Sequence, residues 1–245
     1  GLLAETSIPT DQKVSLLTDI IRNRTIPEKQ TGLLTLGGME GSQNLPIWNQ
    51  LLADFDQGKL PEATWIELEE AITATGSADL KAKFEAALDK KAGDQPWKKY
   101  AGALAEGNNR AGRTIFFENQ TAQCIRCHAY DDMGGNAGPP LDGIGNKLSK
   151  EELLIALVEP SKRLAPGYGL ITVELNSGEK ITGTLLEDST SQVKVQIGAN
   201  ERTIPKSEVK SSQLAASSMP PMGTLLSKRE IRNLVTYLSN LRRSE

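Results

Sequence analysis

The sequence predicts a mainly α-helical protein in two parts, with a small antiparallel, barrel-like β insertion inside the second part. Apolar residues recur at helical spacing through the first hundred residues and again towards the C-terminus. The charge balance changes near residue 107, because residues 1–107 carry 11 basic and 16 acidic side chains whereas residues 108–245 carry 17 and 15. Between residues 168 and 212 apolar and polar residues alternate, which is typical of strands. We therefore expect domains at 1–107 and 108–245, with a β insertion at 168–212.

Four amphipathic helices are expected in the first domain. Their apolar faces lie within residues 14–21, 47–55, 65–72 and 80–88. Pro27 is expected to lie beyond the end of the first helix, and a glycine follows each of the others. Consecutive helices with short breaks resemble a HEAT-like array, although no sequence repeat is visible. Because it holds no catalytic constellation, this domain is expected to be a scaffold or spacer, followed by a linker at residues 93–107.

The second domain is expected to contain helices, then strands, then a last helix. The expected helices span residues 110–119, 149–158 and 227–242, and the expected strands span 170–175, 180–186, 192–197 and 202–204. Ser149 with Glu152, and Ser227 with Glu230, have the spacing of capping boxes, which mark where two of the helices begin. A small sheet of this kind resembles an SH3-like or Sm-like module.

Residues 124–128, Cys-Ile-Arg-Cys-His, are the most informative stretch of the chain. They contain both cysteines and the single histidine of the 245 residues. The Cys-x-x-Cys-His pattern is typical of covalent attachment of a c-type haem. Each thiol adds to one vinyl group of the haem, and the imidazole of the histidine becomes the proximal ligand of the iron.

Three other uses of these residues fit less well. A thioredoxin-like redox pair needs a strand before the motif and a helix that starts at it, whereas a helix and a polar loop are expected before Cys124. A disulfide between Cys124 and Cys127 closes a very short loop and adds little stability. A structural zinc site normally needs four nitrogen or sulfur ligands, and this chain offers three.

A low-spin c-type haem needs a second axial ligand, and methionine is the common choice when no second histidine is present. The chain has four methionines, Met39, Met133, Met219 and Met222. Met39 lies far upstream, and Met133 follows His128 too closely to cross the haem. We favour Met219 because Pro220 and Pro221 follow it and stiffen its loop, and Met222 remains the alternative.

The order of several motifs carries a resemblance to a known family. These motifs are Gly112-Arg113-x-Ile115-Phe116-Phe117, Cys124-x-x-Cys127-His128, Gly138-Pro139-x-Leu141-x-Gly143-Ile144-Gly145, Glu159-Pro160-Ser161-Lys162 and Met219-Pro220. Together they make residues 108–245 similar to a mono-haem cytochrome c, of the haem-binding domain type widespread in Planctomycetes and Verrucomicrobia. The second methionine at Met222 is a departure from the family pattern.

The resemblance implies a cytochrome c fold, whose first and last helices cross, with Phe116 against Tyr237 or Leu238. It implies that Cys124 and Cys127 hold the haem and that His128 is the proximal ligand. It further implies that the Pro139 carbonyl orients His128, that Leu141 contributes to haem binding and that Met219 is the distal ligand. The expected function is electron transfer by one covalently bound haem c, without an enzymatic reaction of its own.

Two other functions remain open at this point. The resemblance also allows an electron-acceptor domain of a larger multidomain dehydrogenase. A haem-based gas sensor or peroxidase would need an open or easily vacated distal site. The expected partner is a redox protein or an upstream dehydrogenase domain. The β insertion is either a solvent shield for the haem edge or a docking surface for that partner.

The composition restricts partners and location. The net charge of −3 and the absence of a basic stripe argue against nucleic-acid binding. No run of about 18 apolar residues is present, so no membrane span is expected. Residue 1 is not followed by a charged and then apolar leader, so we expect any export signal to have been removed or to lie upstream. Since bacteria attach haem to this motif outside the cytoplasmic membrane, the resemblance implies a periplasmic or otherwise exported protein.

Overall fold

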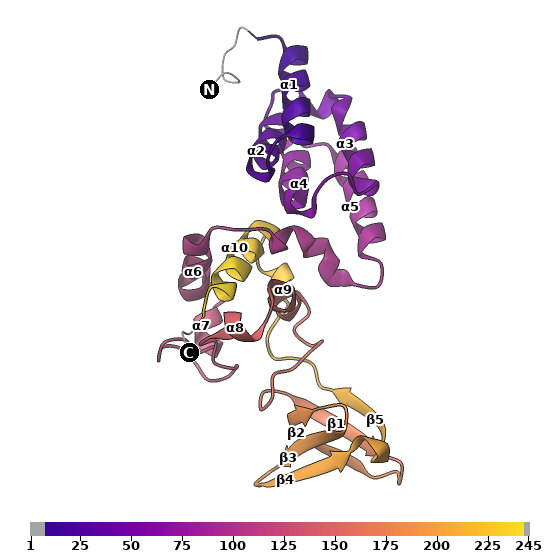
Figure 1. The fold of residues 1–245 in the computed structure, drawn as a ribbon, viewed down its shortest axis with the longest axis vertical. Helices are drawn as coiled ribbons and strands as arrows, with labels where there is room; N and C mark the ends of the chain where they lie inside the picture. Colours follow the sequence, from indigo (N-terminus) through magenta and orange to yellow (C-terminus); the bar gives the residue numbers. More distant parts are fainter. Residues whose placement is uncertain (1–7, 243–245) are drawn as a thin grey trace. The chain divides into compact units, whose positions relative to one another are not determined.

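The computed structural model describes residues 8–242. The fold is mixed, because a helical region is followed by a five-stranded antiparallel sheet and then by a C-terminal helix (Figure 1). The chain divides into two compact units, Gly1–Glu106 and Gly107–Glu245, which we call unit 1 and unit 2. Within residues 8–242 no helix is both long and apolar enough to span a membrane.

All the regular secondary structure in the described residues of unit 1 is helical. Its elements are α1 (Thr10–Asn23), α2 (Ile26–Gly37), η2 (Ser42–Asn44), α3 (Ile47–Asp56), η3 (Glu62–Thr64), α4 (Trp65–Ala74), α5 (Ala78–Ala92) and η4 (Pro96–Leu104), where η denotes a 3-10 helix. Apolar side chains from all five α-helices form one buried core. At its centre the ring of Phe55 packs against those of Trp65 and Phe84, with centroids 5.0 Å apart in both pairs.

Helix α2 was not predicted from the sequence, because Pro27 was interpreted only as a residue that stops a helix. Proline is also well tolerated in the first turn, where its missing N–H has no helical partner. Here Pro27 lies in the first turn of α2, and Glu28 accepts a hydrogen bond of 3.0 Å from the Thr25 backbone N–H. Thr25 and Glu28 form a capping box, a signal that was present in the sequence.

The segment expected to be a linker is also structured. Residues 96–104 form the 3-10 helix η4, in which Trp97, Ala101 and Ala103 are buried. Ala101 belongs to the core of unit 1. The segment was expected to be a linker, but several of its apolar residues are buried along a 3-10 helix.

Unit 2 combines helices and one sheet. Its helical elements are α6 (Asn109–Glu118), α7 (Cys124–Cys127), α8 (Ile144–Lys147), α9 (Lys150–Val158), η5 (Lys206–Glu208), η6 (Met222–Thr224) and α10 (Lys228–Ser239). Both capping boxes are confirmed, with Ser149 and Ser227 each accepting a bond from the backbone N–H of the glutamate three residues later.

Helices α6 and α10 lie in close contact, and the expected contact of Phe116 with Tyr237 is confirmed by a ring separation of 5.8 Å. Their backbones approach most closely at Gly112. A Cβ atom on this residue would lie 2.0 Å from the Asn233 carbonyl oxygen and 2.7 Å from the Tyr237 Cβ. Only glycine permits this approach, so Gly112 sets the distance between the two helices.

The sheet consists of β1 (Leu170–Leu175), β2 (Lys180–Asp188), β3 (Gln192–Ile197), β4 (Asn200–Pro205) and β5 (Val209–Leu214). All neighbours are antiparallel, in the order β4-β3-β2-β1-β5. The sheet is therefore open, with β4 and β5 at its edges, and the expected barrel-like arrangement is corrected to an open antiparallel sheet. Inward side chains such as Val173, Val193 and Val195 form a core made only of sheet residues.

The expected insertion, residues 168–212, ends two residues before the last strand does, and β5 itself was not among the expected strands. β5 continues to Leu214, and the backbone N–H of Ala215 donates to Leu170 at 2.8 Å. This strand has no alternating apolar pattern, because its middle residues are all exposed. The bond from Ala215 to Leu170 places the entry and exit of the sheet side by side.

Replacing Gly112 with alanine tests the crossing of α6 and α10. The new methyl group collides with backbone atoms that cannot rotate away, so Gly112→Ala should lower the free energy of unfolding of unit 2 by about 3 kcal/mol. Urea unfolding followed by circular dichroism measures the change. Thr114→Ala, at an exposed position of the same helix, should change it by less than about 0.5 kcal/mol. Equal stability of the two variants would contradict the role assigned to Gly112.

Candidate functional site

The Cys-x-x-Cys segment forms one turn of helix, α7. Residues three apart lie on the same side of a helix, so Cys124 and Cys127 share one face of this turn. Both cysteines are free thiols, with Cys124 half-buried and Cys127 exposed. The turn thus presents two thiols in a fixed relation to each other.

The Cys124 thiol is not activated. Burial raises its pKa to about 11, so the sulfur remains protonated at neutral pH. Redox-active Cys-x-x-Cys pairs instead have a cysteine whose pKa is lowered. The environment of Cys124 therefore argues against a thioredoxin-like use of the pair.

His128 follows the turn directly and has a fixed ring orientation. Its backbone N–H donates to the Cys124 carbonyl at 3.0 Å, and its Nδ1 lies 2.8 Å from the Pro139 carbonyl oxygen. A carbonyl oxygen only accepts, so Nδ1 carries the proton and donates it to Pro139. In the neutral imidazole, Nε2 then holds the free lone pair that a metal ion would use.

Residues 134–141 pass closely over the α7 turn. Three backbone bonds tie this loop to the turn, from Gly135 to Ile125 at 2.9 Å, from Gly138 to Cys127 at 2.8 Å and from Leu141 to Ala129 at 2.9 Å. These bonds bring the Pro139 carbonyl to the histidine ring. The half-buried Leu141 is thus held beside the motif through its backbone.

Gly138 lies directly against the imidazole ring. A Cβ atom at this position would lie 2.6 Å from Cε1 and 2.8 Å from Nδ1 of His128. A side chain here would push the ring away from Pro139. The absence of a side chain at Gly138 is therefore a condition for the hydrogen bond that orients His128.

A two-residue turn follows the motif. Tyr130 and Met133 exchange backbone hydrogen bonds of 2.9 and 3.1 Å, and Asp131 and Asp132 between them both have positive φ, 53° and 58°. This is the geometry of a type I′ turn, which aspartate tolerates better than most residues. The Asp131 N–H also donates to Asp142 at 3.2 Å. The turn directs the chain from His128 back to the loop that carries Pro139.

Aromatic rings pack beside the turn. Phe117 contacts both Phe116 and Tyr130, with centroids 5.0 and 6.4 Å away, and the Arg113 guanidinium lies over the Phe117 ring. Burial raises the pKa of Tyr237, the neighbour of Phe116, to about 12, so its phenol stays neutral. The contact of Tyr130 with Phe117 was not anticipated from the sequence. It links α6 to the segment after His128.

The four methionines occupy different environments. Met39 packs against the core of unit 1, and Met133 is 49% exposed at the type I′ turn. Met222 is 2% exposed and is part of the interior of unit 2. Met219 is half-buried on the loop before η6, and its backbone N–H donates to the Ser217 hydroxyl at 3.1 Å. Met219 is thus a half-buried methionine of unit 2 on a loop with a hydrogen-bonded backbone, and unlike Met133 it is distant from His128 in the sequence.

The serine contacts of this loop were missed by the sequence analysis. The Ser161 hydroxyl, 56 residues upstream, accepts a bond of 3.0 Å from the Ser217 N–H. A serine hydroxyl that accepts a bond from the backbone N–H two residues later forms a local side-chain turn, which the position of Ser217 before Met219 allows. No local pattern indicates the partnership of Ser161 with Ser217.

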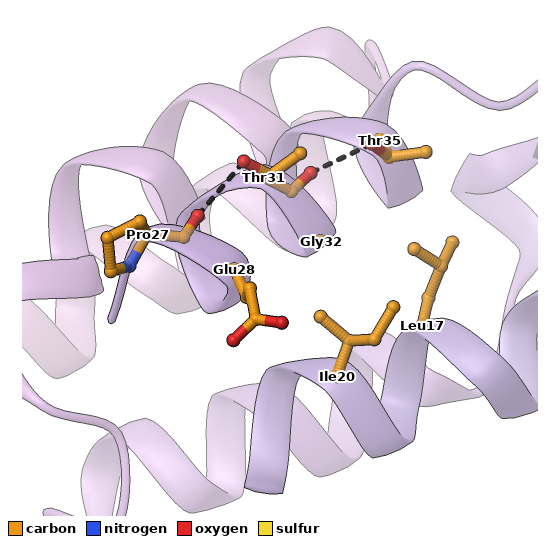
Figure 2. A pocket seen from close by; sticks show the side chains of 7 residues that line it. All are labelled: Leu17, Ile20, Pro27, Glu28, Thr31, Gly32 and Thr35. Atoms are coloured by element: carbon orange, nitrogen blue, oxygen red, sulfur yellow. Dashed lines mark hydrogen bonds between the residues drawn. The ribbon is translucent and has the colours of Figure 1, made fainter. Parts of the chain in front are cut away.

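A pocket between α1 and α2 in unit 1 has no side chains arranged for catalysis or ligand binding (Figure 2). Its lining residues are Leu17, Ile20, Pro27, Glu28, Thr31, Gly32 and Thr35. The hydroxyls of Thr31 and Thr35 donate to carbonyls of their own helix, at 2.9 and 2.8 Å. Glu28 is engaged with Thr25, and these hydrogen bonds lower its pKa. We therefore assign no function to this pocket.

Comparison with known proteins gives no family assignment. No protein-family model matches the chain, and no curated protein is significantly similar to it. Within residues 8–242, no three side chains of His, Cys, Asp or Glu converge on a point that could hold a metal ion. Cys124, Cys127 and His128 are accordingly not arranged as a zinc site would require.

Gly138→Ala tests the contact on which the orientation of His128 depends. The added methyl group should displace the imidazole and break its bond to Pro139. We expect a loss of stability of about 1–3 kcal/mol and a changed chemical shift of the His128 Nδ1–H proton, measured by urea unfolding and NMR. Asn136→Ala, at an exposed position of the same loop, should leave both unchanged. An unaltered Nδ1–H signal in Gly138→Ala would contradict this account.

Proposed function

We propose that unit 2 is a mono-haem c-type cytochrome that transfers single electrons, similar to the haem-binding domain widespread in Planctomycetes and Verrucomicrobia. The observation that supports this most strongly is the geometry of residues 124–139. One helical turn presents both thiols, and the histidine after it has Nδ1 bonded to Pro139. This combination leaves Nε2 as the ligand atom and fixes the ring that carries it.

The donor set fits a covalent haem. The thiols of Cys124 and Cys127 would hold the haem through one thioether each, with each S–H hydrogen transferred to a carbon of the vinyl group to which the sulfur adds. Once attached, the haem supplies an iron that alternates between Fe(II) and Fe(III). The chain fixes the His128 ring through Pro139 and Gly138, and Phe117 of α6 packs against Tyr130, two residues after this histidine.

Met219 is the best candidate for the second axial ligand. Met222 is buried in the interior, whereas Met133 is about half exposed on the turn that follows His128. Met219 is half-buried and lies between a tethered backbone and Pro220. A thioether on a stiff loop can be held towards the iron, and its use as a ligand removes no side chain from the core.

The remaining parts of the proposal follow from the same assignment. Residues 107–245 would form a cytochrome c fold that carries the open sheet as an insertion, and unit 1 would be a HEAT-like scaffold. Because bacteria attach haem to this motif outside the cytoplasmic membrane, we place the protein in the periplasm or another exported compartment. Its partner would be a redox protein or an upstream dehydrogenase domain.

The proposed function predicts one covalently bound haem. Protein produced together with the bacterial haem-attachment machinery should have the mass of the polypeptide plus one haem under denaturing conditions. Acid and organic solvent should not extract the haem, because two thioethers hold it. The Cys124→Ala, Cys127→Ala double variant is the control and should lose the covalent haem. An apo mass for the unaltered protein would refute the proposal.

The absorption spectrum separates electron transfer from the other haem functions. A six-coordinate iron should give a low-spin spectrum that carbon monoxide does not change in the reduced protein. Rapid binding of carbon monoxide would instead favour a gas sensor or a peroxidase.

The proposed function also predicts the effect of removing the Met219 thioether. Met219→Ala should abolish the weak far-red absorption of the sulfur–iron bond and lower the reduction potential, because thioether ligation stabilises the reduced iron. Absorption spectroscopy and a potentiometric titration measure both effects.

The control at Met222 must take account of its burial in the interior of unit 2. Truncating a buried methionine to alanine costs about 2–5 kcal/mol of stability, so Met222→Leu, which conserves volume, is the appropriate variant. It should keep the far-red band and the potential. Loss of the band in Met222→Leu with its retention in Met219→Ala would assign the ligand to Met222.

A further inference from the structure

We propose that Ser161 and Ser217 are positioning residues that hold the Met219 thioether in place. This inference rests on the proposed function, since it concerns the loop that carries the distal ligand. Neither serine touches the iron or contributes a ligand. Their hydroxyls act on the backbone that leads to Met219.

Two hydrogen bonds connect these residues in series. The Ser217 backbone N–H donates to the Ser161 hydroxyl at 3.0 Å, and the Met219 backbone N–H donates to the Ser217 hydroxyl at 3.1 Å. The first bond fixes Ser217 relative to the segment after α9. The second fixes Met219 relative to Ser217, so the position of Met219 depends on both.

Ser161 is attached to a rigid part of unit 2. Helix α9 ends at Val158, and the next residues include the buried Pro160 and a turn in which the Lys162 N–H donates to Glu159 at 2.9 Å. Ser161 lies within this turn. Its hydroxyl therefore provides a fixed acceptor for a loop that is distant in sequence.

The loop itself offers few other anchors. Pro220 and Pro221 have no backbone N–H, so they cannot donate hydrogen bonds that would fix the chain after Met219. The next anchors are the Pro221 carbonyl, which accepts bonds from the N–H and the hydroxyl of Thr224 at 3.1 and 2.8 Å, and the buried Met222. Met219 thus lies between the two serines on one side and Met222 on the other.

Pre-organisation explains why these bonds matter to a haem protein. A neutral thioether is a weak ligand, and its bond to iron opens whenever the loop moves away. One ordinary hydrogen bond changes such an equilibrium about 2- to 10-fold. Because these bonds hold the loop in its closed position, removing either serine hydroxyl should increase the rate at which the Met219 loop moves away from the iron by about this factor.

Ligand exchange with imidazole measures the opening directly. At saturating imidazole, displacement of the thioether is limited by the opening of the loop, and stopped-flow absorption follows the loss of the far-red band. Ser161→Ala and Ser217→Ala in the full-length haem protein should each show displacement about 2- to 10-fold faster than the unaltered protein.

Ser218→Ala is the matched control. Ser218 is exposed in the same loop, and in the part of the chain that the structure describes its hydroxyl makes no hydrogen bond. Its displacement rate should equal that of the unaltered protein. Ser161→Thr retains a hydroxyl at an exposed position and should restore the slow rate. Faster exchange in Ser161→Thr than in Ser218→Ala would count against a role for the hydroxyl.

A second measurement does not depend on the iron. Hydrogen exchange of the Met219 amide reports its bond to Ser217 and should accelerate in Ser217→Ala but not in Ser218→Ala. Equal displacement and amide exchange rates in all three alanine variants, each with an attached low-spin haem, would overturn this inference alone. Unaltered protein without covalent haem would overturn the proposed function and this inference together.

Discussion

The close crossing of α6 and α10 at Gly112 is the contact on which unit 2 depends. Every element of the candidate site lies on the chain between these two helices, so the crossing closes the loop that contains them all. The entropic cost of closing a loop rises only slowly with its length, which allows a long and varied segment between two packed ends. The sheet can be inserted in that segment because its entry and exit are joined by the bond from Ala215 to Leu170.

Backbone hydrogen bonds, more than side-chain charges, organise the candidate site. The loop of residues 134–141 is tied to the α7 turn by N–H groups that donate to carbonyls, and the Pro139 carbonyl in turn orients His128. Such bonds add no net charge beside the ring. A site of this kind holds the His128 ring in one orientation and leaves Nε2 free of the bond to Pro139.

Features with a clear spacing pattern or a counterpart in the resembled family were predicted correctly, and features without either were missed. The capping boxes at Ser149 and Ser227 and the contact of Phe116 with Tyr237 follow from spacing and from a family resemblance, and the structure contains them. Helix α2 was missed because proline has opposite meanings at the two ends of a helix. Strand β5 was missed because its exposed residues do not alternate. The bond from Ser217 to Ser161 spans 56 residues, and no periodicity encodes it.

The open sheet affects the tendency of the protein to aggregate at high concentration. Unpaired edge strands are templates for strands from other molecules, and flat apolar edges promote polymerisation. Edge strand β4 carries Glu201 and Arg202, which pair with Lys194 and Glu179, and it ends at Pro205, which cannot donate to a neighbouring strand. The other edge, β5, carries Lys210 and a row of exposed polar residues. Another chain that added to either edge would have to desolvate these groups, so the sheet can remain open without becoming a nucleus for aggregation.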